Sequence, residues 1–365
     1  MSESNSTHQF PSPIGGVPLP IDLVPSVIFC VLYAAVFSLM TYRIVRRHSR
    51  TFVTIGTLFF CLERYSCRLR IRAVASQHPG LRNNLKFLTY LQTSLAGGFL
   101  TVGGDVTNLI RALLVGSTLG SDMLPLHPKL TPAHARAGAA PARSSSTFLS
   151  AHPGANPEGP AHELQARGGD AGSWGTASLD EALADHPRMR FWLRQACGAT
   201  ALLFLGGVGL AIVAGVNFKH AVLTGERSTL IRVAWCVYGS AALALALLSW
   251  IHLVLCWALF RLPRVPTRSV AWSLLITSLL LLTCIYRIDV LKCSTTALDA
   301  TGRCSNNSPV EKALFWLFHV GAEFGAVAVL VSLNSVKTFG SGLWGDVKNT
   351  DPKPEPPRES TATEA

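Results

Sequence analysis

Ionisable side chains occur inside stretches of this sequence that are otherwise apolar. Asp105, Asn108 and Arg111 interrupt one such run, which extends from Phe87 to Gly116. Successive members of this set are three residues apart, so a helix would bring them toward one face. A charge at the centre of a membrane span costs about 2.5–3.5 kcal/mol, and such groups usually face protein or a water-filled cavity. The pattern therefore predicts a central helix whose polar face turns inward.

A second polar pair lies in the last apolar run, where His319 and Glu323 are four residues apart and share a helical face. Glu63 ends the second apolar run. Intramembrane ionisable groups indicate a functional site, which here would be a ligand pocket, a proton relay or an ion-pair latch. We expect ligand or proton contacts from His319, Glu323 and Glu63, and a latch from Asp105, Asn108 and Arg111.

A purely structural interpretation of the same residues stays open. Glu63 or Asp105 would then pair permanently with Arg64 or Arg111. Removing one partner of a buried pair costs about 3–5 kcal/mol, so such pairs can simply hold a bundle together. The presence of His319 and Glu323 is not required by helix packing, which favours a functional role for those two.

Hydrolytic and nucleotide-dependent chemistry finds no support in the motifs. A zinc site needs several converging ligands, but the spans offer only His252 and His319, which fall toward opposite membrane faces. The chain has no G-x-S-x-G elbow, P-loop or dinucleotide-binding glycine pattern. We therefore expect no enzyme activity, no metal and no cofactor.

The composition is that of a membrane protein. Apolar residues make up 49% and charged residues only 15% of the 365 residues, and the mean hydropathy is +0.33. Soluble domains carry about 25% charged residues. The net charge of +11 comes largely from Lys and Arg in short loops, where they set topology. The expected partner is the lipid bilayer, and nucleic acid is excluded.

The apolar runs predict an all-α integral membrane bundle of seven transmembrane helices. The second of them is uncertain, because its apolar run stops at Leu62 and a re-entrant half-span is the alternative. If it continues to about Ser76, then Arg64, Arg68 and Arg72 form a stripe that we expect to extend toward the outer headgroups. The expected spans are about 21–42, 51–76, 87–116, 195–217, 233–260, 269–286 and 313–336.

Between and around the spans the composition divides the chain into segments. Residues 118–187 are rich in Ala, Gly, Pro and Ser, and residues 337–365 in Pro, Glu and Thr, so both are predicted to be disordered. The organisation is a short outer segment (1–20), spans one to three (21–117), a cytoplasmic insert (118–187), spans four to seven (188–336) and a cytoplasmic tail (337–365).

Basic residues predict the orientation. Four arginines within residues 43–50 follow the first span, which places that loop in the cytoplasm and the N-terminus outside. Asn5 and Asn306 begin glycosylation sequons. Cys293 and Cys304 share an outer loop, where oxidising conditions favour a disulfide. We expect the plasma membrane or the secretory pathway.

Four segments carry a resemblance to known proteins. They are RTFVTIGTLFFCLER (50–64), VGGDVTNLIRALLV (102–115), NSPVEKALFWLFHVGAEF (307–324) and FGSGLWGD (339–346). They resemble uncharacterised multispan membrane proteins of basidiomycete fungi, some of them labelled as similar to family C G-protein-coupled receptors. The resemblance covers the spans without the insert and implies a seven-span fold, but no ligand. The large outer ligand domain of family C receptors does not fit about 20 residues before the first span.

These observations predict a receptor-like protein that senses an unknown small ligand and signals through a cytoplasmic protein. Glu63, His319 and Glu323 would contact the ligand, and Asp105 with Arg111 would form the latch. The alternative is a transporter or exporter of lipids or small solutes that uses the same polar face.

Overall fold

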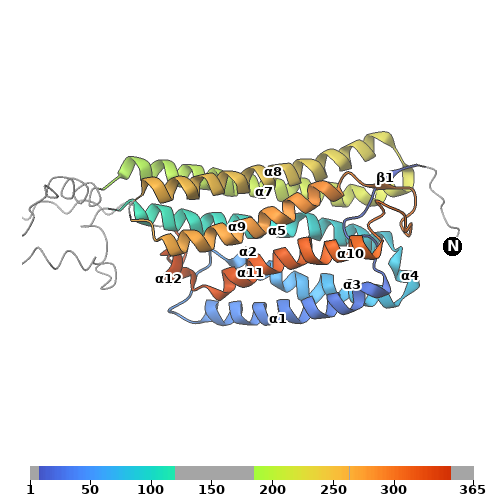
Figure 1. The fold of residues 1–365 in the computed structure, drawn as a ribbon, viewed down its shortest axis with the longest axis horizontal. Coiled ribbons are helices and arrows are strands. Elements are labelled where there is room, and N and C mark those ends of the chain that lie inside the picture. The colour runs from blue at the N-terminus through green and yellow to red at the C-terminus, as the bar shows by residue number, and fades with distance from the viewer. Residues whose placement is uncertain (1–7, 120–184, 263, 347–365) are drawn as a thin grey trace, which may run out of the picture. The chain divides into compact units, whose positions relative to one another are not determined.

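The computed structural model describes residues 8–119, 185–262 and 264–346 (Figure 1). Contacts divide the chain into two units, residues 1–118 with 187–365 and residues 119–186. All helices and strands named below belong to the first unit. Nearly all of the predicted insert, and the part of the predicted tail from 347 onward, lie outside the described residues.

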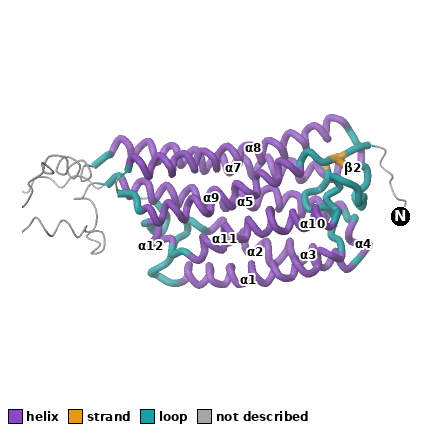
Figure 2. Tube along the Cα trace, in the orientation of Figure 1, coloured by secondary structure: helices purple, strands orange, loops and turns teal. Residues whose placement is uncertain are grey.

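The first unit is a bundle of long helices (Figures 1 and 2). Two of its helical rods contain a π-helical turn: α2 (Ile55–Glu63) continues through η2 (Arg64–Arg68) into α3 (Leu69–Gln77), and α10 (Pro309–Leu314) continues through η5 (Phe315–Gly321) into α11 (Ala322–Ser332). The others are α1 (Leu23–Val45), α5 (Leu85–Ser117), α7 (Pro187–Thr224), α8 (Arg227–Arg261) and α9 (Thr267–Val290).

Short elements mark the two ends of this bundle. At one end, which we call the β1 end, strand β1 (Phe10–Pro11) pairs antiparallel with β2 (Ser294–Thr295), near η1 (Pro20–Asp22) and α4 (Pro79–Arg82). At the opposite end, the α12 end, α12 (Ser335–Phe339) follows α11 (Figure 1). Phe10 faces Thr295 in the two-stranded ladder.

Six helices within the described residues are long and apolar enough to cross a membrane: Pro20–Val45, Leu85–Ser117, Pro187–Thr224, Arg227–Arg261, Thr267–Val290 and Pro309–Ser332. Large apolar side chains on these helices, such as Leu202, Trp235 and Phe260, are exposed and suit contact with lipid. The chain is therefore an integral multi-pass membrane protein, and the all-α membrane bundle is the fold that the sequence predicts.

The rod formed by α2, η2 and α3 is not among the six, because Glu63, Arg64, Arg68, Arg70 and Arg72 make it too polar. It nevertheless runs the length of the bundle beside α1. At its start, the Phe52 N–H donates to the Leu343 carbonyl at the α12 end (2.8 Å). Near its finish, Arg72 donates to the Gly15 carbonyl at the β1 end (2.5 Å).

The helix α5 occupies the centre of the bundle and packs on α7, α2, α8 and α9. In its most apolar 18-residue window 72% of residues are buried, against 17% in the window of the first span. The structure thus shows the central helix that the sequence predicts. Its apolar side chains from Leu95 to Val115 form the middle of the main core.

The predicted boundary of the disordered tail is wrong for residues 337–346. The last long helix ends at Ser332, and α12 and the following turn fold back on the bundle. Arg194 of α7 forms a bidentate ion pair with Asp346 (2.8 and 3.2 Å), and Phe339 is 2% exposed. These contacts join residues far apart in sequence, so composition alone did not reveal them.

Candidate functional site

Two π-helical turns hold the most unusual side chains of the bundle. The turn η2 carries Arg64 and Arg68, and η5 carries His319. All three side chains are at most 2% exposed. A π-helical turn is rare, widens the helix locally and often occurs at functional sites.

Arg64 connects three helices. Its guanidinium contacts the Glu323 carboxylate of α11 at 2.8 Å and the Glu63 carboxylate at 2.9 Å. The same nitrogen that contacts Glu63 also donates to the Ser94 hydroxyl of α5 (2.9 Å). Arg64 is 1% exposed and Glu323 0%, whereas the Glu63 side chain is 30% exposed. The structure therefore brings together two of the acids that the sequence predicts, with Arg64 between them.

Glu63 is fixed by hydroxyl groups from α5. The Tyr90 phenol donates to one carboxylate oxygen at 2.7 Å, and the Ser94 hydroxyl donates to the same oxygen at 2.5 Å. Charge-assisted hydrogen bonds of this kind are stronger than neutral ones. Glu63, Arg64 and Ser94 consequently form a fixed connection between the π-helical turn and the central helix.

A second ion-pair group lies toward the β1 end and centres on Asp22. This carboxylate contacts Arg72 of α3 at 3.1 Å and Lys312 of α10 at 2.9 Å. It also accepts from the Trp316 indole N–H at 2.9 Å. Asp22 is 0% exposed and stands at the start of the first span. One acid thus ties together three rods of the bundle.

Arg68 and Arg287 are buried without a carboxylate partner. Arg287 of α9 donates through one nitrogen to the Leu95 and Ala96 carbonyls of α5 (3.0 Å each). Its Nε and second terminal nitrogen have no hydrogen-bond partner among the described residues, and neither has Nη1 of Arg68.

His319 lies beside these arginines. Both nitrogens of its ring lack a partner within the described residues. The ring packs near Tyr286 and Phe315, with centroids 6.1 and 5.5 Å apart, and is within electrostatic reach of Arg287 and Arg68. We call the whole set the charged cluster: Asp22, Glu63, Arg64, Arg68, Arg72, Arg287, Lys312, His319 and Glu323.

The N-terminal segment, residues 8–19, closes the bundle over the charged cluster at the β1 end. Ile14 and Val17 are at most 3% exposed. Lys312 donates to the carbonyls of Gly15, at 2.8 Å, and of Val17. The Val17 N–H donates to the Asn307 side chain at 2.9 Å. Charged residues of the spans therefore bind the backbone of this segment directly.

An aromatic layer closes the cluster on the side facing the α12 end. Tyr33 of α1 packs edge-on against Phe60 of α2 and Phe324 of α11, with centroids 5.8 and 5.2 Å apart. Phe60 also lies under the Arg64 guanidinium, 4.3 Å from the ring centroid. Packed side chains therefore lie next to the cluster on the side of the α12 end, as the N-terminal segment does at the β1 end.

The three predicted latch residues lie apart from the charged cluster. Asp105 accepts from the Thr57 N–H at 2.6 Å and from the Thr57 hydroxyl at 2.8 Å. Thr57 is the third residue of α2, so Asp105 of α5 acts as a helix cap supplied by another helix. The close approach requires glycine at position 56, where an added Cβ would lie 2.9 Å from the carboxylate.

Asp105 and Arg111 form no ion pair in this conformation. Both residues are described, and Asp105 is engaged by Thr57 instead. Six residues separate them on one helix, which places them about 9 Å apart along the axis and a third of a turn apart around it. Asn108, half-buried between them, makes no hydrogen bond with either within the described residues. The pair therefore cannot close while α5 stays a regular helix.

The arginine stripe of the second rod also differs from expectation. Arg64, Arg68 and Arg72 are 1%, 2% and 2% exposed and turn into the bundle, so they do not extend to the headgroups. Asp22, Arg72, Arg287 and Lys312 belong to the site although the sequence pattern does not mark them as site residues. Asp22, Arg287 and Lys312 each lie near the end of an apolar run, where a charge is usually taken as a boundary, and Arg72 was predicted to extend to the headgroups. The spacing of four residues between Arg64, Arg68 and Arg72 was the one sequence pattern that pointed to Arg72.

Cys293, Cys304 and Asn306 lie near the β1 end. The sulfur atoms of Cys293 and Cys304 are 2.7 Å apart. The Asn306 side chain is 3% exposed and donates to the Pro13 carbonyl at 3.2 Å, so the folded segment disfavours a glycan there. Asn5 lies outside the described residues. No group of three metal-ligating side chains occurs in the described part of the chain.

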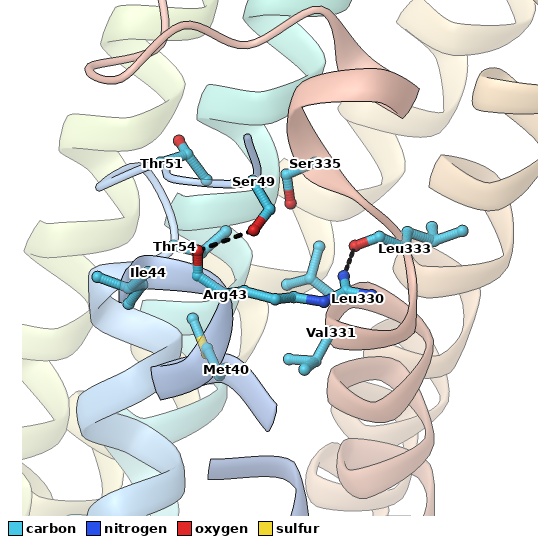
Figure 3. A pocket seen from close by; sticks show the side chains of 10 residues that line it. All are labelled: Met40, Arg43, Ile44, Ser49, Thr51, Thr54, Leu330, Val331, Leu333 and Ser335. Carbon is cyan, nitrogen blue, oxygen red and sulfur yellow. Dashed lines mark hydrogen bonds between the residues drawn. The ribbon is translucent and has the colours of Figure 1, made fainter. Parts of the chain in front are cut away.

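A small cleft at the α12 end does not qualify as a ligand site (Figure 3). Its volume is about 20 Å³, which suffices for a single water molecule. Arg43 crosses it and donates to the carbonyls of Ser332, at 2.8 Å, and Leu333 at the end of α11. This arginine therefore caps a helix C-terminus, a structural role.

Comparison with known protein families, with curated proteins and with solved structures gives no match to this chain. The functional inference consequently rests on the geometry of the charged cluster.

Proposed function

We propose that this protein is a receptor-like, seven-span membrane sensor, and that the charged cluster is the element that responds to a small ligand. The observation that carries the proposal is the position of the cluster on two π-helical turns, η2 and η5, each in a different rod. A π-helical turn can return to α-helix when its backbone hydrogen bonds change register by one residue, which provides the two-state element that sensing requires.

The proposed orientation places the β1 end outside the cell and the α12 end in the cytoplasm. The arginine-rich loop at 43–50 and the basic segment 261–268 both belong to the α12 end, where positive charge is expected in the cytoplasm. A ligand would then reach the cluster from the β1 end after movement of the N-terminal segment. Cytoplasmic loops at the α12 end would contact the signalling protein.

Closure on both sides favours a sensor over a transporter. A solute transported along the bundle axis must pass the N-terminal segment and then the aromatic layer of Tyr33, Phe60 and Phe324. A sensed ligand needs only the first of these to move. The ion pairs of Arg64 with Glu63 and Glu323 would change partners when the ligand binds, which couples η2 to α11.

A transporter or exporter of lipid-like solutes remains the second candidate, and one groove favours it. The groove lies between η2–α3 and α4–α5, has a volume of about 290 Å³ and is lined by Ser66, Arg70 and apolar side chains. Glu63, 30% exposed, precedes it by one turn. An amphipathic molecule could approach the cluster sideways along this groove.

Cysteine accessibility distinguishes the two functions. Ser94→Cys at the cluster and Phe60→Cys in the aromatic layer would be labelled with a membrane-impermeant thiol reagent from each side. The background would have exposed Cys67 and Cys256 replaced by alanine. The sensor predicts that Ser94→Cys reacts only from outside and Phe60→Cys from neither side.

Two exposed positions supply the controls for this experiment. Arg303→Cys should react only from outside and Arg47→Cys only from the cytoplasm. Labelling of Ser94→Cys from both sides would show a continuous path across the membrane, and the sensor proposal would then give way to transport.

A further inference from the structure

Positive charge exceeds negative charge in the charged cluster. The described members include five cations, Arg64, Arg68, Arg72, Arg287 and Lys312, and three carboxylates, Asp22, Glu63 and Glu323. Glu311 is the next carboxylate along α10, but it is engaged by the Ser308 N–H and by the Cys304 N–H (2.9 Å). Isolated buried charges are costly unless they are paired, so an excess of this size indicates a missing partner of opposite charge.

The excess is localised on Arg68 and Arg287. Arg64 has two carboxylates, and Arg72 and Lys312 share Asp22. Arg287 donates only to backbone carbonyls, and neither arginine forms an ion pair with a carboxylate among the described residues; Glu323 is within electrostatic reach of both but is already paired with Arg64.

Unpartnered donors on three helices belong to this same region. They are Nη1 of Arg68 on η2, Nε and Nη2 of Arg287 on α9, and the ring N–H of His319 on η5. His319 is within electrostatic reach of both arginines, and all three side chains are at most 2% exposed. Guanidinium groups bind carboxylates and other small anions through paired N–H donors.

We propose that Arg68, Arg287 and His319 bind a small, singly charged anion, either a halide or the carboxylate of a small organic acid. The two sources share one negative charge and strong hydrogen-bond acceptance. One charge of this kind would pair with both arginines, and the burial of the three side chains favours a small anion. Naming this anion as the sensed ligand rests on the proposed function, but its binding does not.

The full-length protein in detergent or nanodiscs provides the test. Its thermal unfolding midpoint would be followed while sodium gluconate is replaced by sodium chloride or sodium acetate at constant ionic strength. Gluconate serves as the reference because its chain of hydroxyl-bearing carbons makes it a much larger anion than chloride or acetate. A ligand that binds only the folded state raises the midpoint in a saturable manner.

Substitutions then locate the site. Arg68→Gln and Arg287→Gln should each abolish the anion-dependent shift, whereas Arg70→Gln, an exposed position on the same rod as Arg68, should preserve it. A saturable shift in the wild type that both cluster variants lose supports the proposal. The halide and acetate arms identify which source binds.

Three results would overturn the proposal. The midpoint of the wild type could be the same in all three salts, the shift could persist in both cluster variants, or Arg70→Gln could remove it as well. If a variant fails to fold, the wild-type titration still shows whether the unfolding midpoint depends on the anion. If the anion binds but does not change the thiol labelling of Ser94→Cys, the proposed sensing function is rejected. The proposed anion site then still stands.

Discussion

Arg64 carries its charge in the interior of the bundle, and two carboxylates of unequal exposure balance it. A buried ion pair adds little net stability compared with an apolar pair, because desolvation offsets the Coulomb attraction. Removing one partner of the pair is nevertheless costly, because the charge of the other partner stays buried. The three groups therefore act mainly to fix α11, η2 and α5 relative to one another.

Replacing Glu323 by Gln should destabilise the protein more than replacing Glu63 by Gln. Glu323 is 0% exposed, so its loss removes half of the compensation of Arg64 in the driest part of the site. We expect a cost of about 3–5 kcal/mol. Glu63 is 30% exposed, and its loss should cost about 1 kcal/mol. Thermal unfolding of both variants in one detergent checks the order, and equal midpoints would contradict the burial argument.

Asp105 should be coupled energetically to Thr57 and not to Arg111. The Asp105 carboxylate accepts two hydrogen bonds from Thr57, whereas it makes no ion pair with Arg111 in this conformation. Double-mutant cycles with Asp105→Asn should give a coupling of about 0.5–1.5 kcal/mol with Thr57→Val. With Arg111→Gln the effects should add within about 0.5 kcal/mol. A larger coupling to Arg111 would restore the latch hypothesis.

Residue types in apolar runs predicted only part of the site. Glu63, His319 and Glu323 stand out in the sequence because each interrupts or ends an apolar run, and all three belong to the charged cluster. Arg287 and Lys312 lie near the ends of spans, so nothing in their spacing shows whether they face water or protein. That distinction depends on helix rotation, which long-range contacts such as Arg287 with Leu95 determine.

At the scale of elements, helical periodicity does not reveal where a helix departs from α-helical geometry. The spacing of Arg64, Arg68 and Arg72 suggested one stripe on a regular helix, but η2 inserts a π-helical turn between α2 and α3. The same holds for η5, which changes the phase between α10 and α11. The sequence predicted the helices but not these turns. A π-helical turn widens the helix, and this widening depends on side chains of neighbouring helices that pack against it.

The loop between α9 and α10 fastens the N-terminal segment. The Ser12 N–H donates to the Cys293 carbonyl at 3.0 Å, and the Ser12 hydroxyl donates to the Cys304 carbonyl at 2.6 Å. Both cysteines therefore hold the segment that covers the charged cluster. Burial, followed by the hydrogen bond with Cys304, raises the pKa of the Cys293 thiol to about 12.

We expect Cys293 and Cys304 to form a disulfide in the oxidised protein, and the reduced protein to lose stability above about pH 9. The raised pKa means that the folded state keeps the Cys293 proton while the unfolded thiol, with its ordinary pKa near 9, ionises. The unfolded state then binds fewer protons, so stability falls as pH rises from about 9 toward 12. Unfolding midpoints with and without reductant should therefore diverge at alkaline pH.

Mass spectrometry of peptides under non-reducing conditions identifies the cross-link directly. Cys293→Ser serves as the control, because it should abolish both the linked peptide and the dependence of the midpoint on reductant. If protein purified without reductant gives no linked peptide, the predicted disulfide is wrong.

At the scale of the whole molecule, the second rod decides the topology. Its four arginines would cost up to about 10–14 kcal/mol as an isolated segment on insertion scales, so hydropathy rejects it as a span. In the bundle, three of these arginines turn inward, toward carboxylates that α1 and α11 supply to two of them. The charge that argues against a span in the sequence is therefore compensated by neighbours.

We predict that the rod from Ile55 to Gln77 crosses the membrane and gives seven passes. Its two ends bind opposite ends of the bundle, through Phe52 to Leu343 and through Arg72 to Gly15. Seven passes put the N- and C-termini on opposite sides, whereas six put them on the same side. Glycosylation reporters inserted before residue 8 and after residue 346 measure this difference, because only lumenal sites gain a glycan that glycosidase removes.

The expected result is a glycan on the N-terminal reporter only. A reporter in the 78–84 loop should also be modified, whereas one in the 46–54 loop should not, since the second rod separates them. Modification of both termini, or of neither, would show an even number of passes. A re-entrant half-span would then place both ends of the rod on one side, and its arginines could not reach Asp22 and Glu323 as the bundle requires.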